Sequence, residues 1–185
     1  MEHRAAWQLT RDAFVEYQDW AYGHVQHDSQ GALWLQYWLY YYHQDSIAIG
    51  DDHEGDWEMA QVRLGSDQTP DLVAYRQHQD GERCSWAGTE KDVSGNHPKV
   101  YVARTTHASY FREGTHRLYD HNDNNGDGII PQVLEVQRDS PGWVGWPGTW
   151  GGPEGAGGPE GPRFSLSGAL WEDPGDWVPT VNNCT

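Results

Sequence analysis

An acidic segment lies directly before a strand-like stretch of the chain, in the run GDDHEGDWEMAQVRL at residues 50–64. Asp56 and Glu58 have the same parity as the apolar residues that follow, so strand alternation places both carboxylates on the core-facing row. A buried carboxylate is costly unless it is hydrogen-bonded, paired or metal-bound. No Lys or Arg occurs between Gly50 and Gln61, so the local sequence offers no basic partner.

A divalent metal ion is one solution to this buried charge. His53 lies just before the pair, and Asp45 follows the preceding strand-like stretch. Oxygen-rich ligands with one imidazole suit a hard ion such as Ca²⁺, Mg²⁺ or Mn²⁺ better than zinc. We therefore predict a metal site, with Ca²⁺ or Mg²⁺ favoured, at Asp45, His53, Asp56 and Glu58. A solvated acidic turn at the strand end is the alternative, because such turns are common in acidic chains.

A second cation site is suggested by the run DNNGDG, which begins at Asp123. Asp123, Asn125 and Asp127 occupy alternate positions and Gly128 follows them, as in the first half of a calcium loop. The closing acidic residue of that loop is missing, because Leu134 stands at the twelfth position. We predict a structural calcium site here, with an ion-free turn rich in Asn, Asp and Gly as the alternative.

The run THASYF brings His107 and Ser109 to the end of a strand-like stretch. A nucleophilic serine with His107 as its base is one interpretation. The interpretation that we favour places His107 beside the metal, where it or Glu58 acts as a general base if the protein is an enzyme. A histidine simply hydrogen-bonded at a strand end accounts for the same residue. His78 is a weaker candidate for the same role.

Two arginines and a tryptophan are candidates for ligand contacts. Arg76 and Arg104 read as strand-interior cations, which either neutralise buried carboxylates or bind a substrate carboxylate or phosphate. Trp146 lies in a loop rich in Gly, Pro and Trp, at residues 141–163. We expect Trp143, Trp146 and Trp150 to keep this loop ordered, since free linkers rarely carry indoles.

Short strands with turn signals dominate the pattern of elements. We predict strands at Leu33–Tyr42 and Trp57–Leu64, paired antiparallel, and further strands in DLVAYRQH and HPKVYVARTTHASY. The first 30 residues contain one predicted short helix, in RDAFVEYQDWAYGHV. The sequence therefore predicts one all-β domain over residues 1–185, an antiparallel β-sandwich with long Gly/Pro/Trp-rich loops.

Composition limits the partners. The formal net charge is −16, which disfavours nucleic acid and anionic lipid and favours cations. No apolar run is long enough to span a bilayer, and the first ten residues lack a signal-peptide core. The protein is therefore expected in the cytoplasm, or outside the cell if a signal has been trimmed. Two cysteines exclude a disulfide framework and leave one bridge open. The oligomeric state is open as well.

The words HEGDWE and HASYF lie within a longer run that also includes YGHVQHDSQGALWLQYWLYYYHQD. On these words, about three quarters of the chain resembles bacterial relatives of the vacuolar protein sorting-associated protein 62 family. A remoter resemblance is to the necrosis-inducing secreted proteins, whose GHRHDWE word helps to hold a divalent ion together with an upstream Asp. That resemblance implies a β-sandwich similar to membrane-active cytolysins. The ion ligands that it implies fall on Asp45, His53, Asp56 and Glu58. The match is partial, because Gly55 replaces the second His of the word and Asp52 its leading Gly.

Two function classes follow. The first is a metal-bearing β-sandwich that recognises a small polar ligand such as a glycan or a lipid headgroup, with Arg104 and Trp146 among its ligand contacts. The second is a metal-dependent enzyme, most plausibly a hydrolase, in which the ion activates water and His107 or Glu58 moves the proton.

Overall fold

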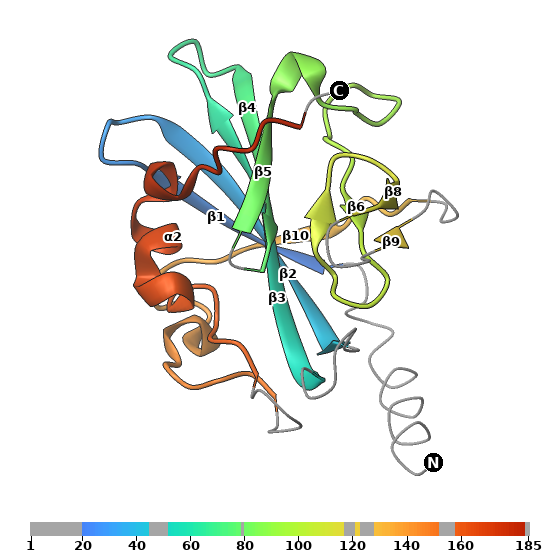
Figure 1. Cartoon of the computed structure of the whole chain (residues 1–185). Helices are drawn as coiled ribbons and strands as arrows, with labels where there is room; N and C mark the ends of the chain where they lie inside the picture. The colour runs from blue at the N-terminus through green and yellow to red at the C-terminus, as the bar shows by residue number, and fades with distance from the viewer. Residues whose placement is uncertain are drawn as a thin grey trace.

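The main element of the fold is a six-stranded sheet (Figure 1). The structure is a computed structural model, and it describes residues 20–44, 52–78, 80–116, 121–122, 128–151 and 158–183. Its order is β10-β1-β2-β3-β4-β5. The strands are β1 (Trp20–His27), β2 (Leu33–Gln44), β3 (His53–Leu64), β4 (Pro70–Gln77), β5 (Asp80–Ser85) and β10 (Gln132–Glu135). The all-β fold is confirmed. The sheet is mixed rather than purely antiparallel, since β10 runs parallel to β1.

The central hairpin agrees with the predicted pair of strands. β2 and β3 pair antiparallel from Leu33 opposite Leu64 to Gln44 opposite His53. Both strands extend beyond the predicted ends and meet at the segment that contains Asp45, which is outside the described residues. β4 covers the strand predicted in DLVAYRQH.

Two sequence predictions are wrong. Residues 20–25, the end of the predicted helix, belong to strand β1, because pairing with β2 and β10 outweighs a loose helical spacing. The earlier part of that predicted helix is outside the described residues. The run HPKVYVARTTHASY is not one strand. It forms β6 (Tyr101–Val102) and β7 (Ser109–Tyr110), which pair antiparallel around a tight turn.

Small elements complete the fold around the main sheet. A second short hairpin pairs β8 (Gly114–Thr115) with β9 (His121–Asn122). The only α-helix among the described residues, α2, spans Ala169–Glu172. The 3₁₀ helices are η2 (Trp86–Gly88), η4 (Gly142–Gly145), η5 (Ser165–Gly168) and η6 (Pro174–Trp177). No helix among the described residues is long and apolar enough to cross a membrane.

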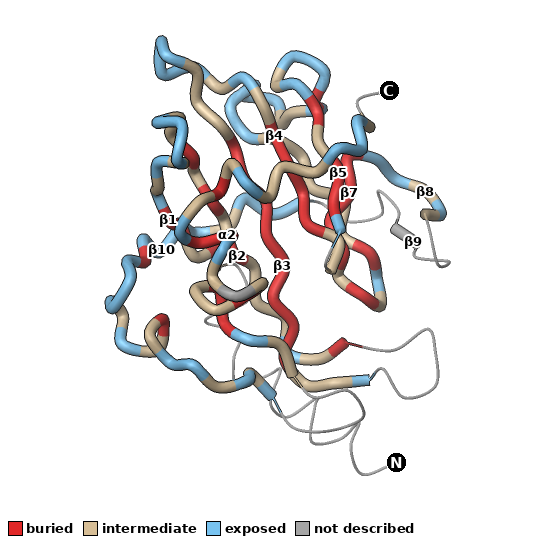
Figure 2. Tube along the Cα trace, turned by 60° about the vertical axis from the view of Figure 1, so that its left-hand side comes forward, coloured by how far each residue is buried: buried red, intermediate tan, exposed pale blue. Residues whose placement is uncertain are grey.

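Strand β3 is buried on both faces of the sheet, as its continuous red trace in Figure 2 shows. One face packs a cluster formed by Trp38, Trp57, Met59, Val136, Val144, Leu170 and Trp171. The opposite face packs a cluster formed by Ala60, Val62, Val73, Tyr75, Cys84 and Phe111. The alternation predicted for β3 is therefore observed, with neighbouring residues serving different cores.

Indoles hold the Gly/Pro-rich segment against the first of these faces. Trp57 stacks on Trp143 at 5.8 Å between ring centroids and meets Trp150 edge-on at 5.4 Å. Trp146 in turn meets Trp150 edge-on at 5.7 Å. Aromatic pairs of this kind each add about 0.5–1.5 kcal/mol beyond area burial. The predicted ordered loop is thus observed where the segment is described, with residues 152–157 outside that part.

Candidate functional site

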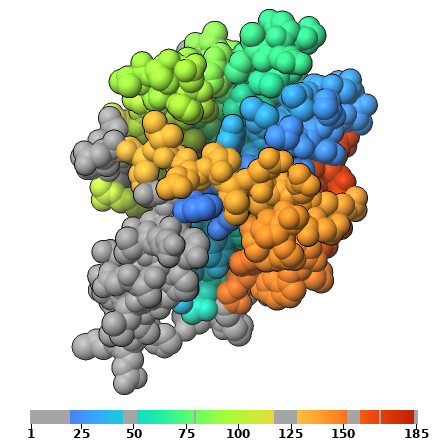
Figure 3. Space-filling model, turned by 180° about the vertical axis from the view of Figure 1, so that it is seen from behind, coloured from blue at the N-terminus to red at the C-terminus, as the bar shows by residue number. Residues whose placement is uncertain are grey.

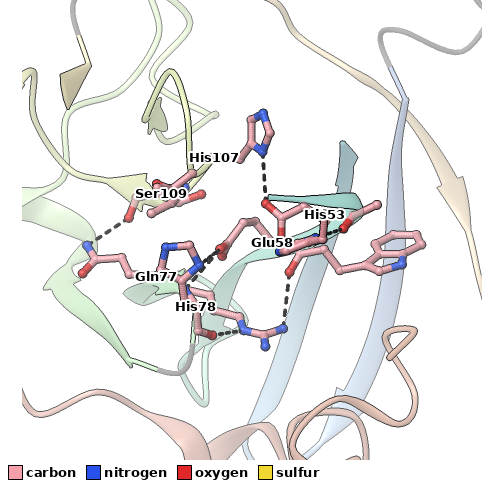
Figure 4. Close-up of polar contacts among 12 residues, drawn as sticks. His53, Glu58, Gln77, His78, His107 and Ser109 are labelled. Atoms are coloured by element: carbon pink, nitrogen blue, oxygen red, sulfur yellow. Dashed lines mark hydrogen bonds and ion pairs between the residues drawn. The ribbon is translucent and has the colours of Figure 1, made fainter. Parts of the chain in front are cut away.

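Two buried carboxylates, two residues apart in sequence, lie on the β3 face that also carries Ala60 and Val62. Asp56 is 5% exposed and Glu58 is fully buried. Trp57, between them, points to the opposite core. The predicted placement of both carboxylates on a core-facing row is therefore observed. Figure 4 shows Glu58 with His78 and His107 nearby.

Each carboxylate faces a histidine from another element. His107, in the turn before β7, donates from Nδ1 to Asp56 Oδ2 at 3.1 Å. The backbone N–H of His78, just after β4, donates to Glu58 Oε1 at 3.1 Å, and the Nδ1 atom of His78 lies 3.7 Å from the same oxygen. The sequence indicates His107 beside these carboxylates and His78 as a weaker candidate for the same role. The structure brings His107 from the turn before β7 and His78 from just after β4 to the two carboxylates.

Both histidines have a left-handed backbone, with φ of 59° at His78 and 57° at His107. This region is uncommon for residues other than glycine and costs of order 1–3 kcal/mol where the surroundings impose it. Two such residues, each set against one of the two buried carboxylates, identify the cluster as a candidate functional site. We call Asp56, Glu58, Arg76, His78 and His107 the acidic cluster.

Tyr41 fixes the orientation of the His107 ring. The two rings stack in parallel, with centroids 4.1 Å apart and 3° between their planes. Burial raises the pKa of the Tyr41 phenol, and the charges of Glu58 and Asp56 raise it further, so it stays neutral. Since Nδ1 of His107 carries the proton donated to Asp56, Nε2 of a neutral ring is left as an acceptor.

A buried arginine from β4 supplies a positive charge near the two carboxylates, which residues 50–61 lack. Arg76 is 9% exposed and donates to the backbone carbonyls of His78 and Trp57. Burial lowers its pKa, while the charges of Glu58 and Asp56 act in the opposite direction. The formal charges of the two carboxylates and the one guanidinium sum to one net negative charge for the acidic cluster.

The predicted metal ligands are only partly brought together. His53 donates from Nδ1 to the carbonyl of Gly55 at 2.7 Å. Within the described ranges, no group of three His, Cys, Asp or Glu side chains is placed to hold an ion. Asp45, the fourth predicted ligand, is outside those ranges, as are Asp123, Asn125 and Asp127 of the predicted calcium loop. Both metal sites therefore stay predictions.

Gly55 explains where this sequence departs from the GHRHDWE word. Its φ is +76°, and a Cβ atom built there would collide with the Trp150 carbonyl. A histidine in this position would need both a strained backbone and a displaced Trp150. The tryptophan-bearing segment therefore occupies the space in which the second histidine of that word would begin.

Three other candidates lie apart from the acidic cluster or contribute less to it. Ser109 is fully buried and its Oγ atom has no hydrogen-bond partner in the described part of the chain, so it is not bonded to His107. Arg104 lies exposed in the turn between β6 and β7, not in a strand interior. Trp146 is 47% exposed and packs on Trp150, which belongs to the core on the opposite sheet face.

Cys84 forms a disulfide bond. Cys184, the other cysteine of the chain, is outside the described residues. The neighbouring residues Asn182 and Asn183 run beside β5: Asn182 bridges in parallel to Arg83, and Asn183 donates to Glu82 at 2.6 Å.

Comparisons with known proteins give one structural match. No family model and no curated protein matches the sequence. A solved structure described as "NLPPya in complex with mannosamine" aligns with 63% of this chain at 17% sequence identity and a TM-score of 0.42. This chain spans 50% of the length of that one.

Proposed function

We propose that the acidic cluster binds a divalent ion and, with it, a small hydroxyl-rich ligand of the glycan class. The observation that carries the proposal is the pair of buried carboxylates, Asp56 and Glu58, each set against a histidine held in a left-handed conformation. Carboxylate oxygens with imidazole nitrogens are the donor types that hard and borderline divalent ions take. When bound, a divalent ion would offset the repulsion between the two carboxylates and change the net charge of the cluster from one negative to one positive.

Charge and exposure support a neutral, hydroxyl-bearing ligand. A net charge of −16 repels anionic ligands. Sugar hydroxyls can donate to carboxylates and accept from guanidinium or imidazole groups. The side chains of His78 and His107 are 40% and 16% exposed, so they form the accessible edge of the otherwise buried cluster. Asp45 and His53 are the further ion ligands proposed from the sequence.

Titration calorimetry on dialysed, chelator-treated protein tests the proposal. We expect Ca²⁺, Mg²⁺ or Mn²⁺ to bind at one site that Asp56→Asn weakens at least tenfold. The matched control is Asp71→Asn, because Asp71 is an exposed carboxylate paired with Arg63. A glycan panel is then screened with and without the ion. Equal ion binding by both variants and the wild type would contradict the proposal.

A hydrolase is the second candidate, and one observation favours it. The Asp56–His107 hydrogen bond fixes the imidazole so that Nε2 is free to take a proton from water or substrate, as a general base does. The ion would supply a polarised water. His107→Ala should then abolish turnover of a responsive substrate and leave ion affinity within about threefold. His97→Ala is the control, since His97 also pairs with a carboxylate, Asp92, but lies exposed.

A further inference from the structure

A second polar site lies away from the acidic cluster, on the edge of the sheet where β1 meets β10. A hollow of about 430 Å³ opens there, between β1, the chain after β10 and α2. Its lining includes His24, Glu135, Arg138, Trp171 and Glu172. This volume is within the usual range for small-ligand sites. Figure 3 shows the molecule from behind, with the gold and orange segment after residue 128 lying over the blue of β1.

His24 at the wall of this hollow has one defined tautomer. Its Nδ1 atom donates to Gln36 Oε1 at 3.0 Å. The Gln36 amide cannot be reversed without loss, because its Nε2 atom donates to Gln61 Oε1 at 3.1 Å and to the Leu170 carbonyl at 2.8 Å. Gln61 is fixed in the same way, since it donates to the Pro174 carbonyl at 3.2 Å. The proton of neutral His24 is therefore on Nδ1, and Nε2 is an acceptor.

The Nε2 atom of His24 has no hydrogen-bond partner among the described residues. His24 is only 7% exposed, and its ring stacks on Trp171 with centroids 3.6 Å apart. Burial lowers the pKa of His24 more than Gln36 and Glu172 raise it. The Nε2 atom is not among the buried polar atoms that lack a partner in the described part of the chain, so it is accessible from the hollow and can accept a hydrogen bond from a ligand there.

The charged side chains that line the hollow favour a positively charged donor. Glu135 and Glu172 provide two carboxylates, and Arg138 provides one guanidinium, whose Nη2 lies 3.3 Å from Glu172 Oε1. With neutral His24, the lining has an excess of one negative charge. Ammonium groups can pair with the carboxylates and also donate N–H to Nε2, whereas a neutral alcohol does only the second.

We propose that this hollow binds a small organic ammonium ligand, with His24 Nε2 as the hydrogen-bond acceptor and Glu172 and Glu135 as counter-charges. The site is separate from the acidic cluster and does not depend on its function. Trp171 forms an apolar wall behind the ligand and keeps the His24 ring in place.

A matched pair of probes tests the proposal: 1,3-diaminopropan-2-ol, which carries ammonium groups, and glycerol, which has the same heavy-atom skeleton. Binding is measured by chemical-shift titration of the isotope-labelled full chain, including the histidine ring nitrogens. We expect the amine to bind in the millimolar range, to shift the His24 ring signals, and to bind at least fivefold more tightly than glycerol.

Variants locate the binding. Glu172→Gln should weaken amine binding at least threefold, and His24→Phe, which keeps a ring against Trp171, should remove it. Glu113→Gln, an exposed control, and Asp56→Asn, in the acidic cluster, should leave it unchanged. Equal binding of amine and glycerol, absence of amine binding, or wild-type affinity in Glu172→Gln would each overturn the proposal. Because Glu172 is about half exposed, that variant remains informative if His24→Phe fails to fold.

Discussion

Replacing Arg76 with methionine tests whether its positive charge stabilises the two buried carboxylates, Asp56 and Glu58. The substitution keeps most of the length of the side chain and removes its charge. It also removes two hydrogen bonds, to the carbonyls of His78 and Trp57. Removing one member of a buried charge pair typically costs about 3–5 kcal/mol. We expect about 3 kcal/mol, the low end, because no oxygen of Asp56 or Glu58 lies within ion-pair distance of the guanidinium in the described structure.

Urea and thermal unfolding measure this effect. For a chain of 185 residues, a loss of about 3 kcal/mol corresponds to a fall in Tm of roughly 6–12 °C. The control is Arg63→Met, whose exposed ion pair with Asp71 at 2.9 Å contributes less than about 1 kcal/mol. If an ion binds the cluster, millimolar Ca²⁺ or Mg²⁺ should restore part of the stability of the Arg76 variant. Equal losses in the two variants would refute the compensating role of Arg76.

Three further predictions concern other parts of the chain. Trp150→Ala should lower the free energy of unfolding by about 3 kcal/mol, since Trp150 packs on Trp57, and an unchanged urea midpoint would contradict this. Wild-type stability should fall more steeply than that of His24→Phe between pH 7.5 and pH 5.5. Burial lowers the pKa of His24 in the folded protein, so the unfolded state takes up a proton at higher pH than the folded state does. Stability is therefore lost as the pH falls through about 6.5, the pKa of an unfolded histidine. Parallel pH profiles of the two proteins would exclude this. Asp127→Ala should abolish a calorimetric calcium site, and unchanged calcium binding would show that residues 123–128 form only a turn.

The sequence predicted most of the central hairpin and the facing of its carboxylates. Strand alternation is a local rule, so it placed Asp56 and Glu58 on the core-facing row without knowledge of their neighbours. It could not identify the partners, which come from β4 and from the turn before β7. Arg76 and His107 are 20 and 51 positions from Asp56, and only the packing of β4 and β7 on β3 brings them to the cluster.

β1 shows where local patterns fail. The run WAYGHVQH, at Trp20–His27, has apolar residues at spacings that fit a helix as well as a strand. Its extended conformation comes from pairing with β2, the next strand in the chain, and with β10, which is distant in sequence. The same pairing places His24 opposite Gln36, so that the two side chains form a hydrogen bond at the wall of the hollow. The sequence alone did not indicate this feature.

The most direct test of the proposed ion site is anomalous diffraction from a crystal of the dialysed protein soaked in Mn²⁺. We predict one anomalous peak at coordination distance from carboxylate oxygens of both Asp56 and Glu58, and no peak in an Asp56→Asn crystal treated identically. The absence of an anomalous peak at the cluster would contradict the proposed ion site.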